Sequence, residues 1–154
     1  MRRIHLAHGI LERDGRLLLV ASRYPNHSQP LWNLPGGRQR EGELLEQTVR
    51  REFREETGLL PEVMGLRYVA ESHDTPSGTH FTSFVFAVAS SGVPVPPTGD
   101  AHVVACEWVP FEQLRTVLTV QVVCEPLLTY LIDPRRRYFG YAEAGITIEF
   151  ADEP

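Results

Sequence analysis

The chain has 154 residues, of which 42% are hydrophobic and 23% are charged, and its formal net charge at pH 7 is −5. This length predicts a single folded domain over residues 1–154, including a C-terminal tail at about 133–154, and the composition is that of an ordinary water-soluble protein. The acidic balance argues against a protein that binds long nucleic acid through its phosphates, but not against one that binds a small anionic ligand.

The first half of the chain predicts a β-hairpin followed by a helix. Residues 4–11 and 16–22 are apolar-rich and are joined by an Asp-Gly pair, which is a strong hairpin signal. The second of these runs predicts a strand that is buried on both faces. The stretch Glu43–Thr57 contains no glycine or proline, and Gly58 follows it in the C-cap position, so this stretch predicts a helix.

The second half of the chain predicts mainly strands. Segments 63–71 and 80–89 are rich in β-branched and aromatic residues and are separated by a turn-forming loop at 72–79. A proline-rich surface loop follows at 90–100. The remaining expected elements are a strand at 102–109, a short helix at 111–117, a helical segment at 120–132 that is interrupted or restarted at Pro126, and an alternating strand at 145–150. Because strands outnumber helices and do not alternate regularly with them, the sequence predicts an α+β sandwich with a mixed sheet.

The first predicted helix combines apolar and acidic side chains on one face. On a wheel at about 100° per residue, Glu52 and Glu56 fall in the same stripe as the apolar Val49 and Phe53. Burial of such a carboxylate pair is strongly unfavourable without compensation, so a positive group is expected there. Glu55 lies at the edge of this stripe, so three carboxylates can converge on Mg²⁺ or Mn²⁺, cations that prefer oxygen ligands.

The alternative is a solvated helix face on which these glutamates pair with neighbouring arginines. Two features disfavour this interpretation. The wheel places two of the glutamates on the apolar side of the helix. In addition, the turn Pro35-Gly36-Gly37 precedes the helix at close range, and glycine allows the backbone to approach a ligand closely.

Residues 37–59 also contain a recognisable family pattern. They run Gly37, five residues, Glu43, seven residues, and then Arg51-Glu52-Phe53-Arg54-Glu55-Glu56-Thr57-Gly58-Leu59. This segment resembles the complete Nudix box, G-x5-E-x7-R-E-U-x-E-E-x-G-U with U a bulky apolar residue, and every fixed position is filled over 23 residues. The resemblance extends to the approach at 32–37 and the strand at 107–110, and it covers most of residues 4–132.

The resemblance implies a Nudix fold, which is an α/β/α sandwich with a central mixed β-sheet. It also implies Mg²⁺-dependent hydrolysis of a nucleoside diphosphate linked to another group, with Mn²⁺ as a substitute for Mg²⁺. The implied metal ligands are the main-chain carbonyl of Gly36 and the side chains of Glu52, Glu55 and Glu56. Arg51 would hold these glutamates in place, Glu43 would brace the loop, and the metal would neutralise the pyrophosphate and acidify a bound water.

The same resemblance suggests where a general base and the substrate contacts lie. Family members place the base on a box glutamate or on an acidic residue beyond the fourth strand. We favour Glu52 or Glu55, with Asp100 and His102 as alternatives, because Ala101 occupies the position where relatives often carry glutamate. The candidates for substrate binding are Arg23, Trp32, His80 and Asp100.

The substrate is defined only as a class. The chain lacks the downstream proline associated with ADP-ribose hydrolases, the tyrosine associated with diadenosine-polyphosphate hydrolases, and a coenzyme A signature. A nucleoside di- or triphosphate or a nucleotide-sugar-like compound remains. The competing hypotheses are a non-catalytic nucleotide-binding sensor on the same fold and a purely structural interaction module.

The sequence also suggests the setting in which the protein acts. The N-terminal residues lack an apolar stretch of signal-peptide length, and no run approaches the ~18 apolar residues of a membrane span. Cys106 and Cys124 lie in apolar runs without metal-ligand spacing, so we expect them to be small core residues. We therefore expect a cytoplasmic protein that acts on a small-molecule nucleotide, without a membrane or long nucleic acid as partner, and that forms a homodimer as relatives commonly do.

Overall fold

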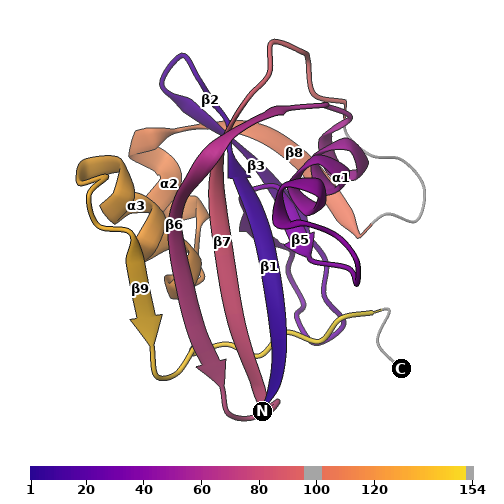
Figure 1. Ribbon diagram of the computed structural model, residues 1–154, viewed down its shortest axis with the longest axis vertical. Coiled ribbons are helices and arrows are strands. Elements are labelled where there is room, and N and C mark those ends of the chain that lie inside the picture. Colours follow the sequence, from indigo (N-terminus) through magenta and orange to yellow (C-terminus); the bar gives the residue numbers. More distant parts are fainter. Residues whose placement is uncertain (96–101, 152–154) are drawn as a thin grey trace.

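The computed structural model describes residues 1–95 and 102–151 and arranges their nine strands in two sheets (Figure 1). The strands are β1 (Arg2–Ile10), β2 (Glu12–Arg13), β3 (Arg16–Ser22), β4 (Leu31–Asn33), β5 (Gly36–Arg38), β6 (Glu62–Asp74), β7 (Thr79–Ala89), β8 (Val103–Pro110) and β9 (Tyr138–Tyr141). The helices are α1 (Leu45–Thr57), α2 (Leu114–Val117), which follows a 3₁₀ turn at Phe111–Gln113, and α3 (Gln121–Ile132).

One sheet is mixed and the other is antiparallel. The five-stranded sheet has the order β5-β1-β7-β6-β9, in which β1 runs parallel to β7 and β9 runs parallel to β6, while the remaining pairs are antiparallel. In the second sheet, β3 lies between β2 and β4 and also pairs with β8, with antiparallel pairing throughout. The predicted α+β class with a mixed sheet is therefore confirmed.

Helices cover the sheets from two sides. Figure 1 shows α1 on one side of the strands and α3 on the other. Strand β3 contributes to both cores, because Leu17 and Leu19 pack with α2 and α3 whereas Leu18 packs with α1, and all three are fully buried. This arrangement confirms the prediction of a strand that is buried on both faces.

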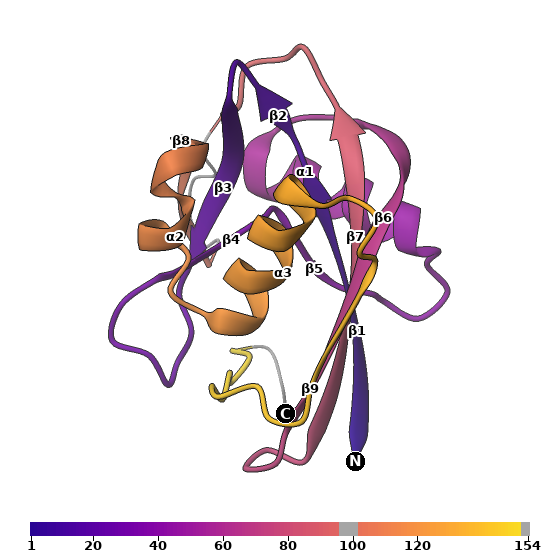
Figure 2. The ribbon, with the colours of Figure 1, turned by 90° about the vertical axis from the view of Figure 1, so that its left-hand side faces the viewer.

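The C-terminal segment differs from the prediction. Residues 145–150, expected as a strand, run extended without pairing into either sheet, and the edge of β6 is occupied by β9 instead. Figure 2 shows the segment after β9 crossing beneath α3 on one side of the molecule. Apolar residues do alternate at 145–150. The backbone groups of Thr147 and Glu149, however, form hydrogen bonds with the Asn26 side chain in a loop rather than with a neighbouring strand.

Two further boundaries also differ. Strands β6 and β7 extend into half of the predicted loop at 72–79, so that only a tight turn remains between Asp74 and Thr79. Helix α3 continues through Pro126 without interruption. The Pro126 ring is buried with Cys124 and Leu127, and this packing offsets the loss of one backbone hydrogen bond.

Among the described residues, no helix is both long and apolar enough to cross a membrane.

Candidate active site

The candidate site begins where β5 passes between β1 and α1. Gly36 has a φ of 156°, and a Cβ at this position would lie 2.2 Å from the carbonyl oxygen of Ala7. A Cβ on Gly37 would lie 2.8 Å from the carboxylate carbon of Glu52. Position 36 therefore requires glycine, because a Cβ there would meet the backbone of β1, whereas a Cβ on Gly37 would displace the Glu52 carboxylate.

Helix α1 presents Glu52 and Glu56 to this turn. Their exposed fractions are 8% and 3%, and Val49 and Phe53 on the same face are fully buried. The Gly36 N–H donates to Glu56 Oε1 at 2.9 Å. The helical wheel therefore predicted the buried face correctly, including its two carboxylates.

The charge of this pair is only partly compensated. Burial and the nearby Glu52 carboxylate raise the pKa of Glu56 well above its ordinary value, and the hydrogen bond from the Gly36 N–H acts in the opposite direction. A buried carboxylate next to a second one disfavours its own ionised form. A cation at this point would relieve the repulsion, and the donor set of carboxylate oxygens matches a hard divalent ion.

Arg51 ties the acidic side chains together. Its Nε and one terminal nitrogen donate to the two oxygens of Glu43, at 2.6 and 3.0 Å. The other terminal nitrogen donates to Glu52 at 2.7 Å and to Glu55 at 3.4 Å, and a further bond of 3.1 Å reaches the carbonyl of Arg38. Arg51 therefore fixes the orientation of Glu52 while it holds the preceding loop against the helix.

Glu43 completes this brace. Its carboxylate also accepts hydrogen bonds from the Arg40 N–H at 2.9 Å and from the Thr48 hydroxyl at 3.0 Å. The hydrogen bonds from Arg51 lower the pKa of Glu43 to about 2, and the same bonds raise the pKa of Arg51. Because the Glu43 side chain closes the loop, α1 begins at Leu45 rather than at Glu43 as predicted.

Glu55 does not converge with the other two carboxylates. Its side chain is 43% exposed and is turned toward Arg51. Within residues 1–95 and 102–151, no three histidine, cysteine, aspartate or glutamate side chains are grouped closely enough to hold a metal ion as they stand. Of the three carboxylates that were expected to converge, Glu52 and Glu56 lie together in the buried face of α1, whereas Glu55 lies at its exposed edge.

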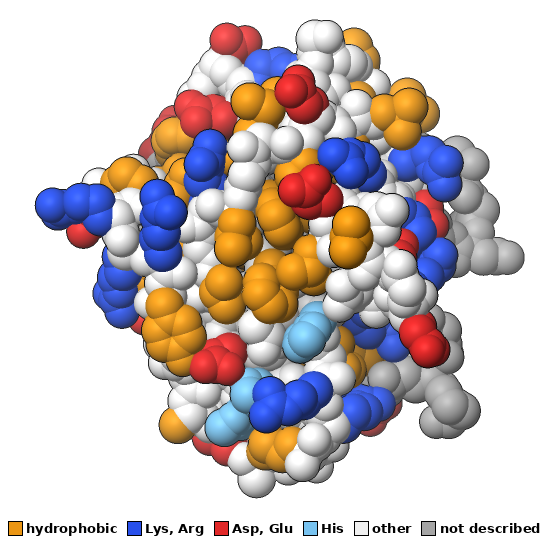
Figure 3. Space-filling view, in the orientation of Figure 1, with side chains coloured by type: hydrophobic (Ala, Val, Ile, Leu, Met, Phe, Trp, Pro, Cys, Tyr) orange, Lys and Arg blue, Asp and Glu red, His pale blue; other side chains and the backbone are white. Residues whose placement is uncertain are grey.

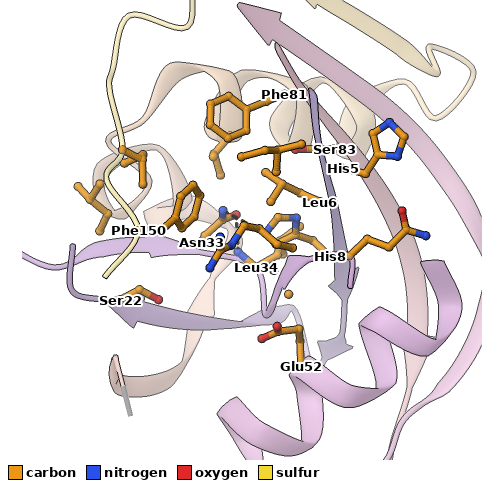
Figure 4. A pocket seen from close by; sticks show the side chains of 18 of the residues that line it. His5, Leu6, His8, Ser22, Asn33, Leu34, Glu52, Phe81, Ser83 and Phe150 are labelled. Atoms are coloured by element: carbon orange, nitrogen blue, oxygen red, sulfur yellow. Dashed lines mark hydrogen bonds between the residues drawn. The ribbon is translucent and has the colours of Figure 1, made fainter. Parts of the chain in front are cut away.

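A cavity of about 1000 Å³ opens beside these residues, between the two sheets. Figure 4 shows Glu52 at one end of it, His8, Asn33 and Phe150 in the middle, and Phe81 toward the other end. Glu52 and Glu55 line the cavity, whereas Glu56 lies behind Gly36. Such a volume is at the upper end of the range for small-molecule sites.

The predicted substrate contacts are distributed unevenly around this cavity. Arg23 and Trp32 line it, and Trp32 also packs against the core. Asp100 lies outside the described residues. His102, by contrast, is described and places its Nε2 3.9 Å from Glu56 Oε2.

His80, which was also predicted to contact the substrate, does not line this cavity. Successive residues of a strand point to opposite faces, and Phe81 and Ser83 are the residues of β7 that point into the cavity. His80 points to the outer face of the sheet, where its Nε2 lies 2.7 Å from Glu71 and its ring packs edge-on against His73. Figure 3 looks onto this outer face and shows histidine side chains near a group of apolar ones.

Sequence reasoning missed several cavity residues. His8 is buried at the wall of the cavity, and this burial lowers its pKa to about 4. Its Nε2 lies 3.4 Å from the side-chain nitrogen of Asn33. The signal that could have indicated His8 is the alternation of Ile4, Leu6 and His8 on one face of β1. Phe150 carried no comparable signal, because only the tertiary path of the tail brings it to the cavity.

Comparison with known proteins was made against families, curated sequences and solved structures. The model of the NUDIX domain family matches residues 1–124. An ADP-ribose pyrophosphatase of Methanocaldococcus jannaschii is 39% identical over 93 residues, which cover 60% of this chain and 54% of that protein. The chain thus matches only about half the length of this relative.

Two solved structures are similar in both sequence and fold. The MutT NUDIX hydrolase from Burkholderia pseudomallei is 30% identical, with a TM-score of 0.63 and coverage of 73% of this chain and 86% of that one. The E. coli ORF135 protein is 26% identical, with a TM-score of 0.70 and coverage of 88% and 92% respectively.

Proposed function

The chain belongs to the Nudix family, and from this membership we propose that it is a Mg²⁺-dependent pyrophosphohydrolase of nucleotides. The substrate we propose is a nucleoside di- or triphosphate or a nucleotide-sugar-like compound. The observation that carries the proposal is the pair of buried carboxylates, Glu52 and Glu56, which lies against Gly36 and Gly37 at one end of the cavity. A purely structural domain has no reason to bury two adjacent carboxylates with incomplete charge compensation.

The residues around this pair fit a divalent metal ion. Glu52, Glu56 and the main-chain carbonyl of Gly36 would hold it, and Glu55 would join them by turning its partly exposed side chain toward them. When bound, the ion supplies charge neutralisation of the pyrophosphate and acidification of a water molecule. The similarity to proteins named as an ADP-ribose pyrophosphatase and a MutT NUDIX hydrolase supports this class of reaction.

The chain's own side chains would then perform three tasks. Arg51 orients Glu52 through a 2.7 Å hydrogen bond and shares its positive charge among three carboxylates. Either Glu52 or Glu55, both of which line the cavity, takes the proton from the attacking water. Arg23 at the cavity wall binds a substrate phosphate.

The test is a product-release screen of the protein and its Glu56→Gln variant with Mg²⁺ and Mn²⁺. The screen covers nucleoside di- and triphosphates, ADP-ribose, nucleotide sugars and dinucleotide polyphosphates. Glu46→Gln is the matched control, because Glu46 lies on the same helix, is exposed, and pairs with the exposed Arg50 at 3.6 Å. We expect metal-dependent turnover that is lost in Glu56→Gln and retained in Glu46→Gln.

Two results would overturn the proposal. One is turnover that survives in Glu56→Gln, and the other is no turnover of any compound by the unmodified protein. The second result together with tight nucleotide binding would instead identify a non-catalytic sensor.

A further inference from the structure

The segment after β9 crosses the open side of the cavity, and we call residues 144–151 the strap. At its first end, the Ala144 N–H donates to the carbonyl of His73 at 2.7 Å. The Thr147 hydroxyl donates to Asp74 Oδ1 at 2.9 Å, and Asp74 is itself buried. The strap is thus fixed to the end of β6.

The second anchor lies in the loop between β3 and β4. The side chain of Asn26 donates to the carbonyl of Thr147 at 2.6 Å and accepts from the Glu149 N–H at 3.0 Å. The ring of His27 lies 2.8 Å from the same Thr147 carbonyl. With anchors on both sheets, the strap spans the space between them.

Every second side chain of the strap faces the cavity. Ile146, Ile148 and Phe150 line the cavity, whereas Glu149 is exposed. This alternation is what a strand would show, but here the apolar face covers a cavity instead of packing against a sheet. The strap therefore forms an apolar wall of the candidate active site.

Phe150 is the most closely held of these wall residues. Its ring meets Phe81 of β7 with centroids 6.4 Å apart and meets Tyr24 edge-on at 6.2 Å. The guanidinium carbon of Arg38 lies 4.1 Å from the Phe150 ring centroid. Aromatic rings from the strap, from β7 and from the loop after β3 thus contact one another in a continuous series along the cavity.

The two ends of the cavity differ in chemistry. Glu52 lies at one end and Phe81 lies at the other with Leu6 and Ser83 nearby, while Phe150 lies between them and contacts Phe81 (Figure 4). The volume of about 1000 Å³ exceeds what a pyrophosphate alone requires. A nucleotide has the matching polarity, because its charged phosphates and its planar base lie at opposite ends of one molecule.

We propose that the strap, through Ile148 and Phe150, closes an apolar compartment with Phe81 that receives the base of a nucleoside di- or triphosphate. This inference rests on the proposed function, since it assumes that the phosphates lie at the carboxylate end. Base stacking on aromatic side chains is strong and tolerates different bases. The strap residues therefore determine the preference for ring-bearing substrates over bare phosphates.

The experiment measures KM and kcat of Phe150→Ala and Phe81→Leu with the nucleotide that the unmodified protein hydrolyses best. Glu149→Ala is the matched control, because its side chain lies on the same strap and points to solvent. We expect KM to rise about 10-fold in both aromatic variants, with kcat changed less than about threefold and no effect in Glu149→Ala. If Phe150→Ala fails to fold, Phe150→Leu keeps an apolar side chain and removes only the ring.

A second measurement separates base binding from an effect through Arg38. Inorganic pyrophosphate, which has no base, is used as an inhibitor of the same variants. If Phe150 contacts the base, the inhibition constant of pyrophosphate stays within about twofold. If Phe150 acted only by positioning Arg38, this constant would rise together with KM, and the proposed compartment would be wrong.

The outcomes distinguish this inference from the proposed function. Turnover by the unmodified protein with unchanged KM in both aromatic variants overturns the compartment and leaves the hydrolase intact. Absence of turnover with every nucleotide overturns the proposed function, and the compartment falls with it.

Discussion

Replacement of Arg51 by lysine tests whether the guanidinium shape, rather than its charge alone, holds the site together. Arg51 donates to Glu43, Glu52 and Glu55 and to a backbone carbonyl, and its side chain is only 12% exposed. Lysine keeps the positive charge but offers a single nitrogen, which cannot reach Glu43 and Glu52 with the same geometry. At least two charge-assisted hydrogen bonds should therefore be lost.

The expected cost follows from the strength of these bonds. A hydrogen bond to a charged group contributes about 1.5–3 kcal/mol, and the solvent that reaches the rim offsets part of this loss. We expect Arg51→Lys to lower the free energy of unfolding by about 3 kcal/mol. For a chain of this length that corresponds to a decrease in Tm of about 10 °C.

Thermal unfolding of Arg51→Lys beside Arg50→Lys measures this effect. Arg50 is the neighbouring residue of α1, but its side chain is 48% exposed and its one described ion pair is 3.6 Å long. Its replacement should change stability by no more than about 0.5 kcal/mol. Equal losses in the two variants would refute the reasoning, because the buried network would then be worth no more than a surface pair.

Three further predictions concern the same site. Mg²⁺ at about 100 times its Kd should stabilise the unmodified protein by about 2.7 kcal/mol, and thermal unfolding with and without Mg²⁺ should show this shift lost in Glu56→Gln; a shift of equal size would place the metal elsewhere. Gly37→Ala should weaken Mn²⁺ affinity about 10-fold or more in a metal titration, because its Cβ would displace the Glu52 carboxylate, and unchanged affinity would contradict this packing. His8 has a pKa of about 4 in the folded state, so it stays neutral there while the unfolded chain gains a proton below about pH 6.5. The His8 contribution to stability is therefore lost as the pH falls, by about 2 kcal/mol between pH 7 and 5, and urea unfolding should show this difference between the unmodified protein and His8→Gln; parallel pH profiles would count against it.

Much of this protein can be predicted from local sequence patterns. The spacing of Val49, Glu52, Phe53 and Glu56 indicated a buried acidic helix face, since a helix places these residues on one side regardless of what packs there. Gly58 ends that helix with a φ of 74°, as its C-cap position predicted. These features depend only on neighbouring residues, which is why the chemistry of the carboxylate site could be inferred before the fold was known.

The tertiary structure decided which residues surround the carboxylates. Asp74 at the end of β6 accepts a hydrogen bond from Thr147, and Asn26 binds the same residue from the other side, although both partners are far from Thr147 in sequence. The sequence at 145–150 has the alternation of a strand, but whether such a segment joins a sheet depends on whether an edge is free, and β9 already occupies the edge of β6. Periodicity within a segment determines which of its faces is apolar, whereas the position of distant segments determines what that face covers, and here it covers the cavity.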